Sequence, residues 1–423
     1  MRKATIQPRL RIVLFSDNKD RELQSLLLVK KALEKKLKAS VFIFGSLAER
    51  QRMLLALEQT QPHLVVISQV FEKSCRELAS YAKQSGAIVV ILPCEIRASK
   101  AYSYLVKNKL LSYRQLVDYL FIPGKSLQAL FNQTDIPVKQ IFLVGSPKID
   151  VVLQKTNKRM SRKSFCDLFS IPHADQNIFF FPSFLTSQEA FLRQDVLFSN
   201  QLHFQRTFNH CVKSSREAYQ RMLLKVADDF PNCSIIVKPH PLEKTNYTTL
   251  TNCKNNLFLV QAPIEHCLDS IDLAVHWMST VAIECWLHQI KVIEYFPIKK
   301  YQSLLPDFSP GNPVVFNYRD LKSNINNYLL HPIPLAMKQF QQKYLKDNYF
   351  SLDGCSATRI AVILQSKITD LPQLNYRPKV SIVIRILFAL ERIVGIRLSR
   401  KMLLLIKPNF QVDYAINNYV NLH

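Results

Sequence analysis

Short apolar runs alternate with amphipathic segments along most of this chain, and no other feature of the sequence restricts its fold as much. In the first part, the intervening segments at residues 21–37 and 71–84 have helical periodicity. Short runs of Val, Ile, Leu and Phe are typical of strands buried on both faces, and strands that alternate with helices form a doubly wound parallel sheet. The runs predict strands at residues 11–16, 41–45, 64–68, 87–92, 119–122 and 141–144.

The alternation begins a second time after a polar and basic stretch. We interpret residues 156–176, which show no strand pattern, as a linker. A long helical pattern follows at 208–229. Further apolar runs predict strands at residues 177–181, 234–237, 257–260, 273–276 and 292–295. The sequence therefore predicts an α/β protein with two tandem Rossmann-like domains facing a cleft, at residues 1–155 and 177–350.

The last part of the chain has a different pattern. Residues 371–379 contain two prolines and are typical of a linker. Residues 380–407 combine apolar side chains with Arg385, Arg392 and Arg400, which would fall within an arc of about 80° on a helix. This pattern predicts a basic amphipathic segment, which either lies on an anionic membrane surface or packs on protein.

Charge and cysteine usage argue against several classes of protein. The chain has 56 Lys and Arg against 32 Asp and Glu, an excess of 24, which favours an anionic partner. No two of its nine cysteines have CxxC spacing, so neither a zinc cluster nor a disulfide framework is expected. There is no recognisable nucleic-acid motif, no signal peptide and no apolar stretch long enough to span a bilayer. We expect a cytoplasmic protein that could lie peripherally on the inner face of the cell membrane.

The sharpest local motif is the sequence Ser-Ile-Ile-Val-Lys-Pro-His-Pro at residues 234–241. It predicts a buried strand that leads directly into Lys238 and His240. Ligands of open parallel sheets bind beyond the carboxyl ends of the strands, so these two side chains are expected at a binding site. The flanking prolines restrict the backbone, the lysine supplies a point charge, and the histidine can donate a hydrogen bond to a phosphate.

A second polar cluster follows within the sequence DLAVHWMSTVAIE, at residues 272–284. Here an expected strand ends before Ser279 and Thr280, which stand at an expected helix start. Hydroxyl groups at such a position can cap the helix or help to hold a phosphate. Glu284 lies about one turn further, where it could accept hydrogen bonds from ribose hydroxyls; the alternative is a solvated helix face.

These motifs, in the order KPHP, DLAVHxxSTxxxE and KVIEY, resemble the donor half of GT-B glycosyltransferases of bacterial surface carbohydrate synthesis. Families with this pattern include capsule Kdo transferases, sialyl- and polysialyltransferases with HP and Ser/Ser-Thr motifs, and CDP-glycerol glycerophosphotransferases. VGSPKID at residues 144–150 is similar to the G-x-P-x-x-D that closes their first domain. DGCSATR at 353–359 resembles a late helix start, and implies a helix at residues 351–370 that crosses back to the first domain.

The resemblance implies a metal-independent, inverting glycosyltransferase of capsule or lipopolysaccharide synthesis that needs no cofactor. Its donor would be a CMP- or UDP-linked sugar, and its acceptor a surface polysaccharide or a lipid-linked glycan. By this resemblance, Lys238 and His240 contact the donor phosphate, and His240 is the catalytic acid that protonates it as it leaves. Ser279 and Thr280 would hold the same phosphate, and Glu284 the ribose.

The catalytic base for the acceptor is expected from the first domain. Glu95 ends a predicted strand where the relatives place a Glu before a glycine, but here Ile96 stands in the glycine's place. Asp17, at the end of the first predicted strand, is the alternative. Either carboxylate would deprotonate an acceptor hydroxyl for in-line attack. There is no DxD triplet in a plausible loop, so a cationic site is expected to neutralise the leaving phosphate without a metal.

Three other functions remain open. A CDP-linked phosphopolyol transferase of the same fold would use His240 and His276 as a pair. A sugar-nucleotide 2-epimerase shares the two-domain plan, but it needs acidic residues around the sugar that we cannot assemble from this sequence. A non-catalytic scaffold in polysaccharide synthesis would be consistent with Ile96 and with a total of only seven glycines.

Overall fold

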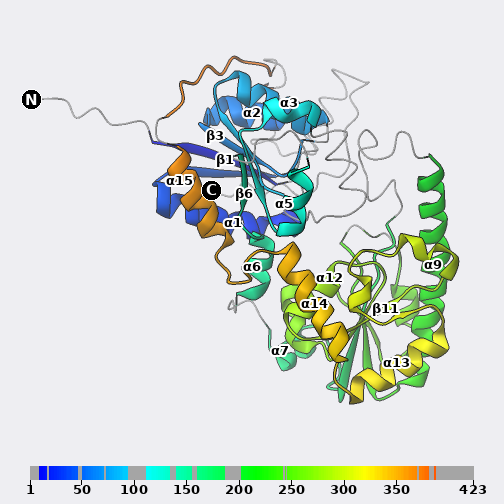
Figure 1. Cartoon of the computed structure of the whole chain (residues 1–423). Coiled ribbons are helices and arrows are strands. Elements are labelled where there is room, and N and C mark those ends of the chain that lie inside the picture. Colours follow the sequence, from blue (N-terminus) through cyan, green and yellow to red (C-terminus); the bar gives the residue numbers. More distant parts are fainter. Residues whose placement is uncertain are drawn as a thin grey trace, which may run out of the picture. The chain divides into compact units, whose positions relative to one another are not determined.

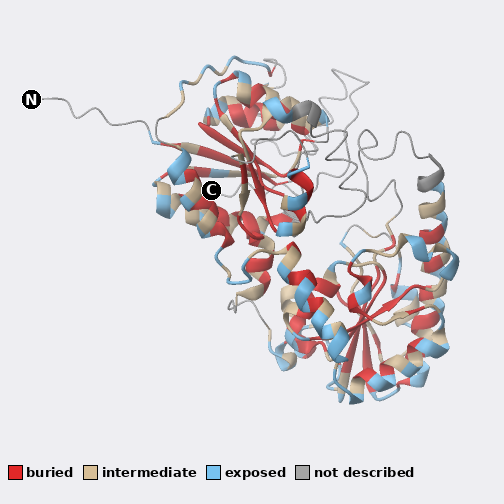
Figure 2. Cartoon of the chain, in the orientation of Figure 1, coloured by how far each residue is buried: buried red, intermediate tan, exposed pale blue. Residues whose placement is uncertain are grey.

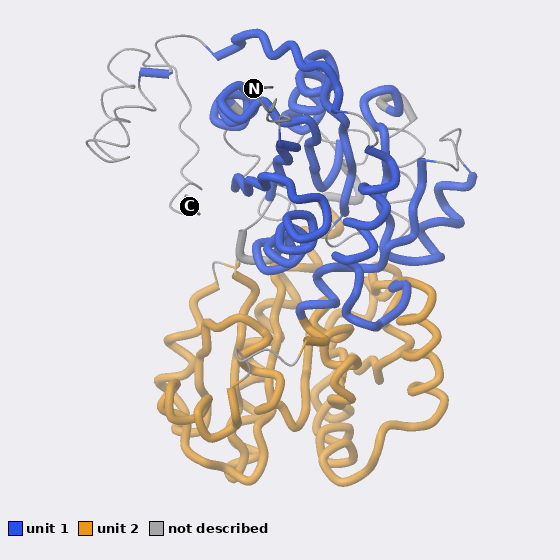
Figure 3. Tube along the Cα trace, turned by 90° about the vertical axis from the view of Figure 1, so that its left-hand side faces the viewer, with its two compact units in different colours: residues 1–151, 349–423 blue, residues 152–348 orange. Residues whose placement is uncertain are grey.

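A computed structural model of the chain describes residues 9–16, 19–45, 50–70, 73–93, 111–133, 140–154, 160–185, 202–241, 243, 245–368, 371–380 and 385–386. The chain forms two compact units, which Figure 3 distinguishes by colour. Unit 1 comprises residues 1–151 and 349–423, and unit 2 comprises residues 152–348.

Unit 1 contains a six-stranded sheet in the order β2-β1-β3-β4-β5-β6, in which all strand pairs are parallel. The strands are β1 (Arg11–Ser16), β2 (Ser40–Gly45), β3 (Leu64–Ile67), β4 (Ile88–Ile91), β5 (Tyr119–Ile122) and β6 (Ile141–Leu143). The helices are α1 (Lys19–Leu37), α2 (Arg50–Thr60), α3 (Lys73–Gln84), η2 (Leu111–Leu116), α5 (Lys125–Phe131), α6 (Pro147–Leu153) and α15 (Ser356–Lys367). The predicted strands of this half are confirmed.

Helix α15 returns from a distant part of the sequence to cover the sheet of unit 1. It packs beside α1, as Figure 1 shows, and both helices contribute to one apolar core. The buried residues of these helices in that core are Leu26, Val29, Leu33, Ala357, Ile360, Ala361 and Leu364.

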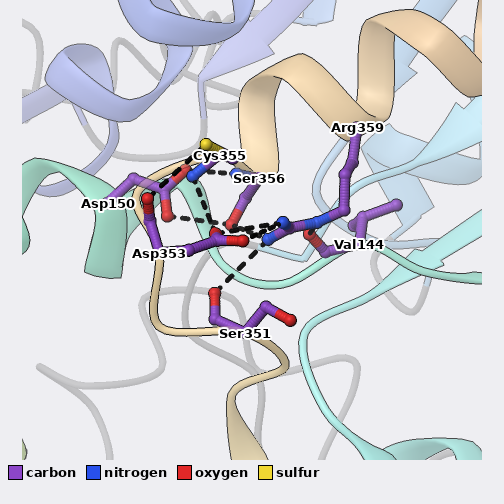
Figure 4. A network of polar contacts seen from close by, with 7 residues as sticks. All are labelled: Val144, Asp150, Ser351, Asp353, Cys355, Ser356 and Arg359. Atoms are coloured by element: carbon purple, nitrogen blue, oxygen red, sulfur yellow. Dashed lines mark hydrogen bonds and ion pairs between the residues drawn. The ribbon is translucent and has the colours of Figure 1, made fainter.

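A polar network fastens the start of α15 to the end of β6 and the start of α6 (Figure 4). The buried Asp150 carboxylate accepts hydrogen bonds from the backbone N–H of Ser356 (2.6 Å) and from its hydroxyl (2.9 Å). Arg359 donates from Nε to the carbonyl of Val144 (2.7 Å) and from Nη1 to Asp353 (2.8 Å). The two motifs VGSPKID and DGCSATR therefore meet in unit 1, where the Asp150 carboxylate caps α15.

Gly145→Ala should destabilise unit 1 by about 2–4 kcal/mol, because the residue has a positive φ and no room for a side chain. Its φ is +88°, and an added Cβ would lie 2.5 Å from Ser356 Oγ and 2.7 Å from the carbonyl oxygen of Phe350. Urea unfolding followed by circular dichroism measures the loss. Gly45→Ala is the control, because an added Cβ there meets no atom of the described residues within 4 Å. Equal unfolding midpoints for the two variants would contradict the prediction.

Residues 371–379, predicted as a linker, run along unit 1 without regular secondary structure. The Tyr376 hydroxyl donates a hydrogen bond to the carbonyl of Pro62 (2.9 Å). The segment passes so close to Gly86, which has a φ of +89°, that a side chain would not fit there. A Cβ on Gly86 would lie 2.2 Å from the carbonyl oxygen of Gln373. This segment is therefore fastened to the body of unit 1.

Arg385, one of the three arginines of the predicted cationic stripe, is paired within unit 1. Its guanidinium forms an ion pair with Glu58, whose side chain is 5% exposed. The Glu58 carboxylate also accepts a hydrogen bond from the backbone N–H of Val380 (3.0 Å). Arg392 and Arg400 lie outside the described residues. Arg385 therefore contributes to protein packing rather than to a membrane-facing stripe.

Unit 2 contains a second six-stranded sheet, in the order β12-β11-β10-β7-β8-β9, and its strand pairs are again parallel. The strands are β7 (Gln176–Phe181), β8 (Cys233–Val237), β9 (Leu257–Leu259), β10 (Leu273–His276), β11 (Lys291–Tyr295) and β12 (Val314–Val315). The helices are α7 (Arg162–Leu168), α9 (Leu202–Asp229), α10 (Thr248–Thr251), α11 (Ile264–Cys267), η4 (Leu268–Ser270), α12 (Val281–Leu287), η5 (Lys299–Leu304), η6 (Ser309–Gly311), α13 (Tyr318–Leu330) and α14 (Leu335–Asn348).

The two faces of the unit 2 sheet are covered by different helices. On one face, α9 and α13 form an apolar core with alternate residues of the strands, and Figure 2 shows most of the sheet as buried. The other face carries α12, which packs on β10 and β11. Two parallel sheets with flanking helices confirm the predicted pair of Rossmann-like folds. Among the described helices, none is both long enough and apolar enough to cross a bilayer.

Candidate functional site

The KPHP segment (residues 238–241) continues the line of β8 beyond the end of the strand. The backbone N–H of Lys238 donates to the carbonyl of Phe180 in β7 (2.8 Å), and the N–H of His240 donates to the carbonyl of Pro182 (3.2 Å). The residues between and after these donors are prolines, which have no N–H to offer on the other side. Pairing with β7 therefore persists past the sheet, while the prolines end the pairing on the β9 side.

Strand register places Lys238 on the face of the sheet that carries α12. Val275, Phe180 and Val237 are aligned across β10, β7 and β8, and all three belong to the core beneath α9. The next residues along the strands point to the opposite face, so Lys238 aligns with His276. Because backbone pairing continues with period two, His240 lies on the same face as Lys238.

The ammonium of Lys238 lies near helix α11 on that face. Burial raises the pKa of the Cys267 thiol to about 12, and the charge of Lys238 opposes this shift. Both Lys238 and His240 are only partly buried. Two groups that can bind an anion therefore stand at the carboxyl edge of β8, and neither is fully buried.

His276 ends β10 and is fully buried. Its Nδ1 accepts a hydrogen bond from the backbone N–H of Ser279 (3.1 Å), and its Nε2 lies 3.3 Å from Nδ2 of Asn312. Burial lowers the pKa of His276 to about 3, so the imidazole is neutral at physiological pH. Its role is to hold the turn between β10 and α12, where Met278 has a φ of +49°.

Ser279 and Thr280 stand at the start of α12, as predicted. Ser279 is partly buried, and its Oγ lies 3.4 Å from the backbone nitrogen of Val281. Thr280 is exposed, and its side chain makes no capping hydrogen bond. Helix α12 has only seven residues, so its dipole is small and any anion binding here must depend mainly on the two hydroxyls.

Glu284 does not lie on a solvated helix face, which was the alternative to a ribose contact. The residue is 5% exposed and belongs to the buried side of α12. Neither Glu95 nor Asp17, the two candidates for the base, belongs to the described residues. No group of His, Cys, Asp and Glu in the described parts of the chain is arranged to hold a metal ion.

Sheet order brings the KPHP segment and the Ser279–Thr280 pair to one edge. Strands β8 and β10 flank β7, so their ends are separated by two strand spacings, about 10 Å. Parallel strands present their carboxyl ends at the same edge, and α12 and the side chain of Lys238 share one face. Lys238, His240, Ser279 and Thr280 therefore lie at a common edge and on a common face of the sheet.

Glu243 lies close in sequence to this site, and sequence analysis did not single it out. Its carboxylate accepts hydrogen bonds from the backbone N–H of Phe184 (3.0 Å) and from the hydroxyl of Tyr247 (2.7 Å). The only sequence signal is a carboxylate three positions after His240. At the end of a strand, this spacing indicates neither a shared strand face nor a shared helix face.

Replacing His276 by Gln should flatten the acid limb of the pH–stability profile. Because the folded pKa of about 3 lies below the ordinary value of 6.5, the neutral imidazole stabilises the fold above pH 6.5, and this contribution is lost as the pH falls toward 3. Urea midpoints measured across this range should fall more steeply in the wild type than in H276Q. The exposed His173 supplies the control variant H173Q, which should keep the wild-type slope. A wild-type slope in H276Q would contradict the prediction.

Comparison with known proteins gives a likeness in structure and none in sequence. No protein-family model matches the chain, and no curated protein matches it. Among solved structures, a putative UDP-N-acetylglucosamine 2-epimerase from Listeria monocytogenes matches with a TM-score of 0.55 and 14% identity, over 87% of this chain and 100% of that one. The UDP-GlcNAc 2-epimerase from Neisseria meningitidis bound to UDP-GlcNAc matches with a TM-score of 0.53 and 13% identity, over 85% of this chain and 100% of that one.

A third match is the wall teichoic acid polymerase TagF, with a TM-score of 0.52 and 12% identity, over 86% of this chain and 90% of that one. At sequence identities this low, the structural likeness shows the fold and not the reaction. The chain has the GT-B fold of two Rossmann-like units, as predicted.

Proposed function

We propose that this protein is an inverting glycosyltransferase that takes a sugar from a nucleotide-linked donor and transfers it to a surface polysaccharide or lipid-linked glycan. One observation carries the proposal: two polar segments, KPHP and Ser279–Thr280, lie at the carboxyl edge of one parallel sheet and on one of its faces. Ligands of open α/β sheets bind at this edge.

The four side chains are chemically suited to a phosphate. Lys238 supplies a positive charge, and the Ser279 and Thr280 hydroxyls can each donate a hydrogen bond. His240 can donate to a phosphate oxygen and protonate it as the sugar leaves. The chain has only seven glycines, so side chains rather than a glycine-rich loop would bind the anion.

The remaining assignments extend the proposal to the sugar and the acceptor. Glu284 would bind the donor ribose, which requires a change that exposes its carboxylate, because the residue is buried. Glu95, or alternatively Asp17, would deprotonate the acceptor hydroxyl. The cationic groups would neutralise the leaving phosphate without a metal ion.

Two solved structures of similar fold support a nucleotide-linked donor. The Neisseria meningitidis epimerase is bound to UDP-GlcNAc, and a variant of TagF was soaked with CDPG. The likeness to TagF also favours a second candidate, transfer of a phosphopolyol from a CDP carrier. That reaction was expected to use His240 and His276 as a pair, and the complete burial of His276 argues against direct contact with a substrate.

Thermal unfolding in the presence of CMP-, UDP-, GDP- and CDP-linked compounds tests the donor proposal. We expect a CMP- or UDP-linked sugar to raise the melting temperature by about 5 °C at roughly a hundredfold excess over its Kd. Stabilisation by CDP-glycerol alone would favour the phosphopolyol reaction. Stabilisation by none of them would favour the scaffold.

His240→Ala should reduce sugar transfer by about a hundredfold or more, because the leaving phosphate loses its proton donor. Its melting temperature without ligand should remain within about 2 °C of the wild type, since the side chain is only partly buried. His173→Ala, far in sequence and exposed, is the control that should keep full activity. If H240A loses stability in proportion to activity, His240 is a structural histidine.

Membrane attachment through the C-terminal segment is a separate part of the proposal. Because Arg385 is paired with Glu58, the arginines of the predicted stripe that would meet anionic lipid are Arg392 and Arg400. Arg392→Gln with Arg400→Gln should weaken binding to phosphatidylglycerol vesicles about tenfold or more in a sedimentation assay, at about 1 kcal/mol per charge. Arg385→Gln, which removes one charge where the double variant removes two, should leave vesicle binding unchanged. Equal losses in the two proteins, or no loss, would reject the membrane assignment.

A further inference from the structure

Both backbone polar groups of His240 are fixed by hydrogen bonds. Its N–H donates to the carbonyl of Pro182 (3.2 Å), and its carbonyl accepts from the backbone N–H of Glu243 (2.8 Å). The prolines on either side restrict φ at their own positions. The backbone that carries the imidazole is therefore held by whatever keeps Pro182 and Glu243 in place.

The side chain of Glu243 connects this turn to the segment that follows β7. Its Oε2 accepts a hydrogen bond from the backbone N–H of Phe184 (3.0 Å), and its Oε1 accepts one from the hydroxyl of Tyr247 (2.7 Å). Tyr247 is 1% exposed, so this bond is sheltered from water. Burial raises the pKa of the Glu243 carboxyl, and the hydrogen bond from Tyr247 opposes the shift.

Phe184 is a rigid point of attachment for Glu243. Its ring is fully buried and packs against Trp277 and Tyr219, with centroid separations of 4.6 and 5.2 Å. Its carbonyl accepts a hydrogen bond from Nη2 of Arg216 in α9 (2.7 Å). Glu243 thus joins the turn that carries His240 to the apolar core beneath α9.

We propose that Glu243 is a positioning residue that holds the His240 turn against the segment after β7 and so fixes the imidazole at the phosphate site. The two hydrogen bonds of Glu243, to Phe184 and Tyr247, are here called the clasp. The effect of the clasp on binding rests on the proposed donor site, whereas the clasp itself does not. Glu243 touches no reacting atom in this scheme. Its effect on binding passes through His240.

Three variants separate the parts of the clasp. Glu243→Ala removes both acceptors. Glu243→Gln keeps the amide oxygen for the Phe184 N–H, and its amino group can donate to the Tyr247 oxygen, so it should rescue the geometry. Tyr247→Phe removes a single hydroxyl. Glu217→Ala, on an exposed position of α9, is the matched control for loss of a glutamate.

Amide hydrogen exchange in protein labelled with 15N-histidine measures how firmly the clasp holds the His240 turn, through the exchange rate of the His240 backbone amide. The chain has ten histidines, so the spectrum contains at most ten backbone amide signals, and His276 in β10 serves as an internal reference. Exchange of the His240 amide should accelerate about tenfold in E243A and stay within about threefold in E243Q, with His276 unchanged in both. An unchanged His240 amide in E243A, or no rescue in E243Q, would overturn the proposal.

If the E243A chain unfolds as a whole, the His276 amide will also exchange faster, and Y247F then decides. We expect acceleration at His240 and none at His276 in that variant, and equal rates at His240 in Y247F and the wild type would overturn the clasp. Calorimetry with inorganic pyrophosphate and with UDP gives the functional arm. Affinity should fall about tenfold in E243A and remain near the wild-type value in E243Q and E217A.

The exchange and binding experiments distinguish failure of the donor proposal from failure of the proposed role of Glu243. If the wild-type protein binds neither pyrophosphate nor UDP, the donor proposal is wrong, while the exchange rates still decide whether Glu243 fixes His240. If both ligands bind the wild type and folded E243A with equal affinity, Glu243 has no positioning role at the site, and this inference is wrong while the donor proposal stands.

Discussion

Pairing between β7 and β8 continues beyond the ends of both strands, and the candidate site depends on this continuation. The N–H groups of Lys238 and His240 keep the period of the sheet, while the prolines between and after them cannot pair on the other side. The alternation of Lys238 and His240 with prolines therefore ends the sheet on one side and places the two side chains on the same face. Parallel strand direction then brings the end of β10, with Ser279 and Thr280, to the same edge.

The strands could be predicted from the sequence because strands buried on both faces leave uninterrupted apolar runs. β12 has two residues, Val314 and Val315, and so leaves no such run. The predicted helix at 208–229 begins earlier, at Leu202, since its first turns lack a continuous apolar face. The sequence also predicted that KPHP follows a buried strand and that Ser279 and Thr280 precede a helix, and both are found there.

Contacts between distant residues could not be predicted in this way. Nothing in a local pattern distinguishes a partly exposed His240 from a fully buried His276, because each stands at or just after the end of a strand. Arg385 fits a cationic stripe by periodicity, yet its partner Glu58 is 327 positions away. The contact of Glu243 could not be predicted either, since its partner Phe184 is 59 positions away, in the segment that follows β7. Periodicity reports which face is buried and not which polar groups meet.

A double-mutant cycle on donor affinity tests most directly whether the two segments bind one anion. Lys238→Ala, Ser279→Ala and the double variant are titrated with the nucleotide-sugar that stabilises the wild type. Two residues that bind the same phosphate should show a coupling free energy of about 0.5–3 kcal/mol, whereas independent residues add to within about 0.5 kcal/mol. We expect a coupling free energy in the first range. Additive losses, or no loss from either substitution, would show that the two segments do not bind one anion.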